Sequence, residues 1–248
     1  MNKRLIFLLS SMLSTAALAQ GEVTDERVLA ESSAGENWFL KGGNFRGEHY
    51  SPLDQVNEDN VRGLGVAWST ELPMKDGTAT TPIVVDGVVY IGGAYSLVAA
   101  IDAETGETLW TYDPDMKSVF ARNPGLSWIS RANRGVAVWD GSVYVATADC
   151  RLIAIDAQSG EHQWTKQTCD NDAGFSISDS PYVGGGKIFL GNAGSESEEN
   201  NRGYVSAYDP KTGKEIWRFY NFQSHITEEN DTAALNLSLK HISEPTRL

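Results

Sequence analysis

The chain has 248 residues, with 33 acidic against 20 basic side chains and a formal net charge of −13. Such an acidic chain is a poor partner for nucleic acid, whose phosphates repel it, and it favours solubility or cationic partners. The four histidines form no spaced cluster, so a histidine-based metal centre is not predicted.

The first 19 residues are typical of a secretion signal. Lys3 and Arg4 form a basic start, an apolar stretch runs over Leu5–Leu18, and small residues at Ala17–Ala19 form a cleavage site. The apolar stretch is too short for a good membrane span. We therefore expect the mature chain to be periplasmic and not an integral membrane protein.

A leader is expected over residues 20–35, followed by one β domain over 36–222. The domain opens with a predicted strand near Val66–Ser69. Three β-branched and aromatic runs follow, each broken by Asp-Gly or Gly-Gly, which is the signature of a β-hairpin. These runs lie at 81–92, 135–146 and 180–191.

An eleven-residue phrase follows each hairpin. Its three copies lie 54 and 53 residues apart, at 100–110, 154–164 and 207–217. Each copy predicts a strand, a tight turn capped by an Asp side chain, a Gly suited to positive φ, and a Trp on the next strand that packs between neighbouring units. The residues concerned are Asp102, Asp156 and Asp209; Gly106, Gly160 and Gly213; and Trp110, Trp164 and Trp217.

Two hairpins in each repeat make a four-stranded antiparallel sheet. A fixed period of this length is typical of an array of such sheets. We find no stretch with a period of 3.6 residues that is long enough for a buried helix. The predicted fold class is all-β, an incomplete β-propeller, because three units are fewer than the roughly four to eight that close a ring.

The two cysteines, Cys150 and Cys169, flank the second copy of the phrase. They could form a disulfide in an oxidising compartment, but the strand-turn-strand pattern gives no reason to expect their Cα atoms within about 7 Å. The pattern favours two free, half-buried thiols.

The end of the chain departs from the repeat. Residues 223–248 are expected to be a truncated or non-native tail. Within them, Leu235–Leu248 fits neither the repeat nor a blade start, and it resembles a peptide translated from sequencing-adapter DNA.

Two further stretches carry a family resemblance. The opening Trp38–Trp68 and the stretch Asn133–Trp139, together with the Trp phrase, resemble the quinoprotein alcohol dehydrogenases, which use pyrroloquinoline quinone (PQQ) and calcium. The likeness runs from about residue 36 to about 222. It implies an eight-bladed propeller of which this chain covers roughly the first three blades.

The resemblance also implies roles for individual residues. Arg134 matches the family's arginine that contacts the quinone carbonyl oxygens, where a fixed cation favours the negative charge that develops. Ser178 stands where relatives place a Thr that bonds a cofactor carboxylate, and it keeps the hydroxyl. The backbone at Gly194 and Ser195 would face another PQQ carboxylate.

The metal role falls on one carboxylate. Glu196 matches the family's calcium-binding glutamate, and calcium prefers hard oxygen ligands. A solvated acidic loop is the alternative for this segment. The family's catalytic base comes from later blades, so no residue here is assigned to that role.

Two positions depart from the family pattern. Ala79 stands where many relatives carry a Glu that bonds the cofactor. Trp128 and Ile129 replace two adjacent cysteines, and Trp128 could cover the PQQ ring by stacking or could be packed in the core.

The chain is thus interpreted as the N-terminal part of a periplasmic PQQ- and calcium-dependent alcohol dehydrogenase, with an alcohol substrate and a cytochrome c-type electron acceptor. The piece alone is expected to be inactive, because it lacks the base. The alternative is a non-catalytic periplasmic propeller that acts as a scaffold for protein–protein interaction.

Overall fold

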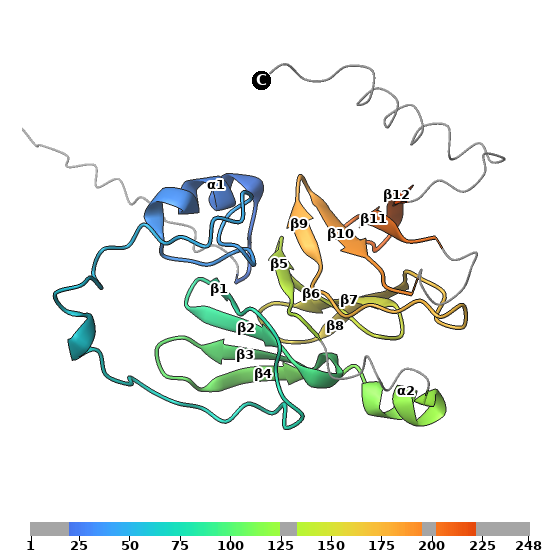
Figure 1. The fold of residues 1–248 in the computed structure, drawn as a ribbon, viewed down its shortest axis with the longest axis horizontal. Helices are drawn as coiled ribbons and strands as arrows, with labels where there is room; N and C mark the ends of the chain where they lie inside the picture. Colours follow the sequence, from blue (N-terminus) through green and yellow to red (C-terminus); the bar gives the residue numbers. More distant parts are fainter. Residues whose placement is uncertain (1–19, 125–132, 195–201, 222–248) are drawn as a thin grey trace, which may run out of the picture.

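A computed structural model describes residues 20–124, 133–194 and 202–221. Three four-stranded antiparallel sheets lie side by side (Figure 1), in agreement with the predicted all-β class. Within each sheet the strands follow the order of the chain. We call the sheets blades 1, 2 and 3.

The bounds of the strands are as follows. Blade 1 contains β1 (Ile83–Val85), β2 (Val88–Gly92), β3 (Val98–Asp102) and β4 (Thr108–Tyr112); blade 2 contains β5 (Ala137–Trp139), β6 (Ser142–Ala146), β7 (Arg151–Asp156) and β8 (His162–Gln167); blade 3 contains β9 (Tyr182–Gly184), β10 (Lys187–Gly191), β11 (Tyr204–Tyr208) and β12 (Glu215–Tyr220).

The largely apolar inner strands are buried, and the more polar outermost strands are exposed. In blade 2, which has a neighbour on each side, all five residues of β6 are buried, whereas five of the six residues of the outermost strand β8 are exposed. The innermost strands are adjacent, since β5 contacts both β1 and β9. The main core therefore lies between the blades and toward their inner strands.

Each repeated phrase forms the predicted turn. The Oδ1 atom of Asp156 accepts hydrogen bonds from the backbone N–H groups of Gln158 and Ser159 at 3.1 and 2.8 Å, and Gly160 follows with φ 74°. The equivalent aspartates of blades 1 and 3 accept the same two bonds. The predicted caps and glycine conformations are confirmed.

The phrase also supplies the contact between blades. The indole of Trp110 donates to the carbonyl of Ala157 in blade 2 at 3.1 Å, and it lies over Gly160 so closely that a Cβ there would come within 2.7 Å of the ring. Trp164 makes the same contacts with Pro210 and Gly213 in blade 3. The predicted packing of Trp between neighbouring units is confirmed.

One expected strand is absent from the described structure. Val66–Ser69 has no strand assignment, but Trp68 within it donates to the carbonyl of Ala103 at 3.0 Å and covers Gly106. Trp68 therefore occupies, on blade 1, the place that Trp110 occupies on blade 2. The position of the Trp68 indole follows from the repeat. Residues 66–69 are not assigned as a strand, because no described strand pairs with them.

No buried helix was predicted, and the described residues contain two short α-helices. Helix α1 (Asp25–Ala34) begins at Thr24, whose side chain accepts from the N–H of Arg27, and it buries Val28. Helix α2 (Met116–Arg122) follows blade 1 and buries Met116. Each helix has a single fully buried residue, which explains the weak apolar periodicity. Single 3₁₀ turns lie at Val61–Gly63 and Ala94–Ser96.

The predicted leader is thus an ordered element. Val23 offers its carbonyl to the N–H of Asp140, Asp25 accepts from the N–H of Gly185, and Arg27 pairs with Asp86 at 2.6 Å. These three partners are the first hairpin turns of blades 2, 3 and 1. Figure 1 shows α1 beside these turns.

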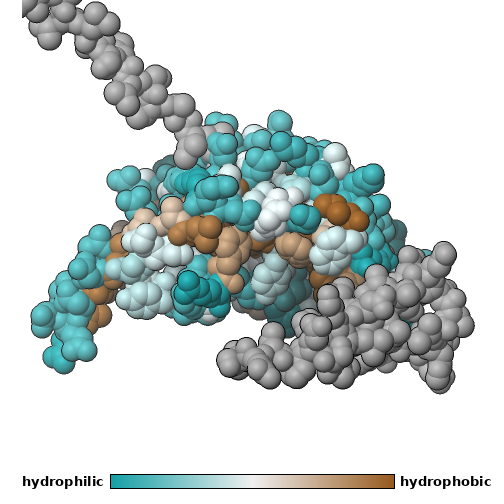
Figure 2. Space-filling view, turned by 90° about the horizontal axis from the view of Figure 1, so that it is seen from above, coloured by the Kyte–Doolittle hydropathy of each residue, from teal (hydrophilic) through white to brown (hydrophobic). Residues whose placement is uncertain are grey.

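Some apolar side chains remain at the surface (Figure 2). Trp217 on β12 is 41% exposed, and Phe219 on the same strand is 42% exposed. Among the described residues, Trp217 has no turn to cover. No helix in the described part of the chain has the length and apolar character to cross a bilayer.

The contact between Trp and Gly can be tested with a matched pair of variants. In Gly160→Ala, the new methyl group meets the Trp110 ring, whereas in Gly141→Ala it meets nothing within 4 Å, although φ is 78° there. Both variants incur the left-handed backbone cost of about 1–2 kcal/mol. We expect Gly160→Ala to lose about 1–3 kcal/mol more free energy of unfolding, from overpacking. Urea unfolding measures both, and equal losses would contradict the docking role of Trp110.

Alkaline pH provides a second test. Burial raises the pKa of Tyr90, Tyr144 and Tyr204 to about 12 in each case. Because the folded state keeps these protons more tightly than the unfolded chain, their stabilising contribution is complete below pH ~10 and is lost as the pH rises toward about 12. We expect unfolding in this window, followed by circular dichroism, and a shallower pH dependence in Tyr144→Phe. An unchanged dependence in that variant would argue against the burial effect.

Candidate functional site

The segments that precede the innermost strands meet at one end of the blades. Thr81 and Gly135 form a parallel bridge, and the N–H of Thr81 donates to the carbonyl of Arg134 at 3.4 Å. The N–H of Arg134 donates in turn to the carbonyl of Ser178 at 3.0 Å. Residues about 50 positions apart in sequence are therefore neighbours here.

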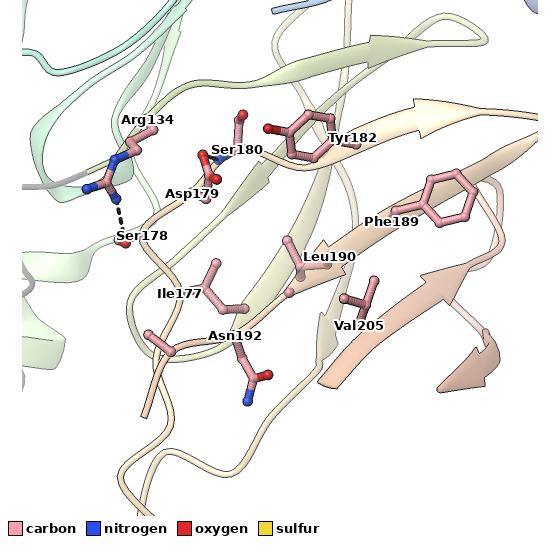
Figure 3. Close-up of a pocket in the computed structure, with 12 residues that line it drawn as sticks. Arg134, Ile177, Ser178, Asp179, Ser180, Tyr182, Phe189, Leu190, Asn192 and Val205 are labelled. Carbon is pink, nitrogen blue, oxygen red and sulfur yellow. Dashed lines mark hydrogen bonds between the residues drawn. The ribbon is translucent and has the colours of Figure 1, made fainter. Parts of the chain in front are cut away.

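Arg134 and Ser178 also meet through their side chains. Nη1 of Arg134 donates to Oγ of Ser178 at 2.8 Å, and both residues line a cavity of about 480 Å³ (Figure 3). Because the hydroxyl oxygen accepts this bond, its own proton remains available to an acceptor in the cavity. The structure thus brings together two of the residues for which the sequence predicted a role.

A third polar group in the cavity wall was not anticipated. Asn192 accepts from the N–H of Tyr204 through Oδ1 at 3.2 Å, while its buried Nδ2 has no hydrogen-bond partner. Apolar side chains form part of the wall; they are Ile177, Phe189, Leu190 and Val205. Asp179, Ser180 and Tyr182 also line it. The cavity therefore combines a cation and an O–H donor with both polar and apolar surface.

The backbone around Arg134 is fixed by a buried amide. Asn133, only 2% exposed, donates through Nδ2 to the carbonyl of Ala146 at 2.9 Å and to Oγ of Ser96 at 3.2 Å, and its Oδ1 accepts from the N–H of Gly135 at 3.0 Å. Every hydrogen-bonding group of this amide is used, so its orientation is unique. The network joins blades 1 and 2 next to Arg134.

Gly194 lies at the start of the loop after β10. Its φ is 108°, and a Cβ there would clash with the carbonyl of Gly174, so the position requires glycine. A bridge between Ser176 and Ala193 places this loop beside the segment that carries Ser178. Three other predicted site residues lie outside the described part of the chain; they are Trp128, Ser195 and Glu196.

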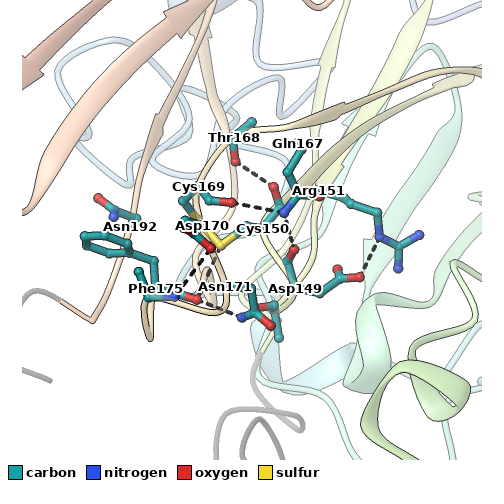
Figure 4. The surroundings of a disulfide bond; sticks show 12 residues. Asp149, Cys150, Arg151, Gln167, Thr168, Cys169, Asp170, Asn171, Phe175 and Asn192 are labelled. Carbon is teal, nitrogen blue, oxygen red and sulfur yellow. Dashed lines mark hydrogen bonds and ion pairs between the residues drawn. A yellow bond between two sulfur atoms is a disulfide. The ribbon is translucent and has the colours of Figure 1, made fainter. Parts of the chain in front are cut away.

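The favoured interpretation of the cysteines was wrong. Cys150 and Cys169 form a disulfide with a Cα–Cα distance of 5.2 Å (Figure 4). The antiparallel pair β7–β8 ends at Arg151 opposite Gln167, and the N–H of Thr168 still donates to the carbonyl of Cys150 at 2.8 Å. The two cysteines therefore lie at adjoining ends of paired strands, and predicting this requires the exact register of β7 against β8.

The disulfide supports the neighbourhood of the cavity. Asn171, two residues after Cys169, donates to the carbonyl of Phe175 at 2.8 Å and closes a compact loop. Gly194 packs against Gly174 and Phe175 of this loop. The disulfide therefore anchors residues 170–175, and Gly194 packs against this loop.

The described residues contain no cluster of metal ligands. In the three described ranges, no group of three or more His, Cys, Asp or Glu side chains is arranged to hold a metal ion. The calcium role of Glu196 stays a prediction. Ala79 has only a methyl group, and the neighbouring Thr80 hydroxyl is buried without a hydrogen-bond partner and does not line the cavity.

The chain shows clear similarity to known proteins. Residues 38–240 match the family model "PQQ: Glucose/ethanol/alcohol dehydrogenase, beta-propeller domain". The chain is 42% identical over 219 residues to a quinohemoprotein alcohol dehydrogenase, ADH-IIG, from Pseudomonas putida, covering 87% of this chain and 30% of that protein. It is 38% identical over 232 residues to a quinohemoprotein alcohol dehydrogenase from Comamonas testosteroni, covering 88% and 32%.

Solved structures agree with this match. The structure of ADHIIG from Pseudomonas putida superposes with a TM-score of 0.78 at 39% identity, covering 89% of this chain and 32% of that one. The Comamonas testosteroni enzyme gives 0.75 at 36% identity, covering 87% and 32%. The chain thus spans about a third of the length of these relatives, and it belongs to the family of PQQ-dependent alcohol dehydrogenases with a β-propeller domain.

Proposed function

We propose that this chain is part of a periplasmic, PQQ- and calcium-dependent alcohol dehydrogenase that oxidises an alcohol to an aldehyde by hydride transfer to the quinone. The observation that carries the proposal is the convergence of Arg134 and Ser178 from adjacent blades on one cavity. The named relatives are quinohemoprotein alcohol dehydrogenases. The whole protein's activity is our inference from both.

The donor set fits the cofactor. PQQ is a polyanion with carboxylates and quinone oxygens, and the cavity offers a guanidinium and a hydroxyl proton. Each is a donor that such acceptors can use. The apolar wall suits the flat ring system.

When bound, PQQ supplies the two-electron acceptor for the reaction. Arg134 would bind the quinone oxygens and stabilise the negative charge that develops on them, because a fixed cation of this kind needs no reorganisation during the reaction. Ser178 would donate its free proton to a cofactor carboxylate while it accepts from Arg134. Asn133 would hold the backbone that aims the guanidinium.

The remaining roles belong to the same proposal. Gly194 and Ser195 would present backbone N–H groups to a second carboxylate, Trp128 would cover one face of the ring, and Glu196 would bind calcium. We assign no catalytic base to this chain, and we expect it to show no turnover alone. Reducing equivalents would pass to a c-type cytochrome.

Export rests on two observations. The first 19 residues are typical of a secretion signal. The buried disulfide suits an oxidising compartment, because cytosolic thiols are kept reduced. Both support the periplasm as the location.

Cofactor binding can be measured with the chain itself. PQQ added with and without calcium should quench the fluorescence of its seven tryptophans. Arg134→Gln removes a charged hydrogen bond and should weaken binding by about 10-fold or more; Ser178→Ala, which removes a neutral one, should weaken it by about 2–10-fold. Arg122→Gln, on helix α2 and outside the cavity lining, is the matched control and should bind as the parent does.

Activity needs the rest of the propeller. A chimera in which this chain replaces the matched third of ADH-IIG should reduce a dye acceptor with an alcohol, while the 248-residue chain with PQQ and calcium should not. If Arg134→Gln and Ser178→Ala both bind PQQ as tightly as the parent chain does, the cavity is not the PQQ site. Turnover by the chain alone would show that the base lies within it.

A further inference from the structure

A second charge lies beside Arg134 in the cavity wall. Of the described residues that line the cavity, Arg134 and Asp179 carry charges of opposite sign. Asp179 directly follows Ser178 in the chain, and Figure 3 shows its carboxylate on the same side of the cavity as the guanidinium. A carboxylate here would repel an anionic ligand and compete for Arg134.

The Asp179 carboxylate is engaged elsewhere. Oδ1 of Asp179 accepts from Nζ of Lys41 at 3.1 Å and from the N–H of Ser180 at 2.9 Å. The bond to Lys41 joins positions separated by 138 residues. The carboxylate is therefore neutralised from outside the blade by the amino-terminal segment.

Lys41 is held in place by its own surroundings. Trp38 exchanges two backbone hydrogen bonds with Val84 of β1, at 2.9 and 3.0 Å, and Phe39 is 1% exposed. The backbone of Gly42 meets that of Gly47 so closely that no side chain fits at Gly42. Because this segment is fixed to blade 1, it presents the ammonium at a defined point.

We propose that Lys41 is a positioning residue of the anion site: it captures the Asp179 carboxylate and so leaves Arg134 free to hold Ser178 and an anionic, carbonyl-bearing ligand. This inference rests on the proposed function for the identity of that ligand as PQQ. The pair's role is electrostatic rather than stabilising, since ion pairs of this exposure, 34% and 51%, contribute little to folding. Without Lys41, the nearest cation for Asp179 in the cavity wall is Arg134.

The proposal predicts effects of opposite sign for the two partners. Lys41→Met should weaken PQQ binding on the order of 3–10-fold, because the uncompensated carboxylate repels the ligand and occupies Arg134. Asp179→Asn should bind PQQ at least as tightly as the parent. The double variant should return to within about twofold of the parent, and Lys41→Arg should retain binding.

A matched control removes the same charge elsewhere. Lys211 pairs with Asp140 at 3.5 Å, and neither residue lines the cavity. Lys211→Met should leave PQQ binding within about twofold of the parent. Its effect measures the contribution of net charge alone.

A readout without PQQ keeps the inference separate from the proposed function. The Nε–H resonance of Arg134, identified in ¹⁵N spectra by its loss in Arg134→Lys, reports the partner of the guanidinium. It should shift and exchange more slowly in Lys41→Met, and it should return to the parent position in the double variant. If the parent chain fails to bind PQQ, this measurement still decides the role of Lys41.

Two results would overturn the proposal. One is an Arg134 resonance that is the same in Lys41→Met as in the parent. The other is Asp179→Asn weakening PQQ binding as much as Lys41→Met does, because a pair that only braces the loop loses the same function whichever partner is removed.

Discussion

The docking of one indole on the turn of the next blade is the contact on which the rest of this structure depends. Trp68, Trp110 and Trp164 each donate to the carbonyl that follows a turn aspartate, at 3.0 to 3.1 Å, and each covers a turn glycine. The hydrogen bond fixes the direction of the ring, and the missing Cβ fixes its distance. Two constraints on one rigid side chain determine how neighbouring blades are set against each other.

The site inherits its geometry from that docking. Arg134 comes from the segment before β5 and Ser178 from the segment before β9, so their 2.8 Å hydrogen bond exists only when blades 2 and 3 hold their relative positions. Asn133 extends the same dependence to blade 1 through Ser96. A cavity assembled from strand ends of several sheets can therefore be precise although no single blade contains it.

The fold was predictable because both halves of the docking contact stand in one repeated phrase. Gly160 receives the indole of Trp110 from blade 1, and Trp164, four residues later, supplies its indole to the turn of blade 3. The hairpins followed from Asp-Gly and Gly-Gly between β-branched runs. Helix α1 was not predicted, because it buries one residue, Val28, and so lacks an apolar stripe.

The site was only partly predictable. Family likeness pointed to Arg134 and Ser178, but no local pattern marks Asn192 or Asn133 as polar groups of the cavity or its support. The disulfide required the register of β7 against β8, which includes a bulge between Ala154 and Ile155. The pairing of Lys41 with Asp179 depends on how two segments 138 residues apart meet in the fold, and a lone Lys or Asp in the sequence does not predict its partner.

The amino-terminal segment links these observations. Val23, Asp25 and Arg27 hold the hairpin turns at one end of the inner strands of all three blades. The chain then pairs along β1 at Trp38 and reaches the opposite end at Lys41, beside the cavity. Because one continuous stretch contacts the inner strands at both ends, it restrains the blades independently of the indole contacts farther out. The cavity geometry therefore depends both on the indole contacts and on the amino-terminal segment. Lys41 belongs to that segment and also pairs with a charged residue of the cavity wall.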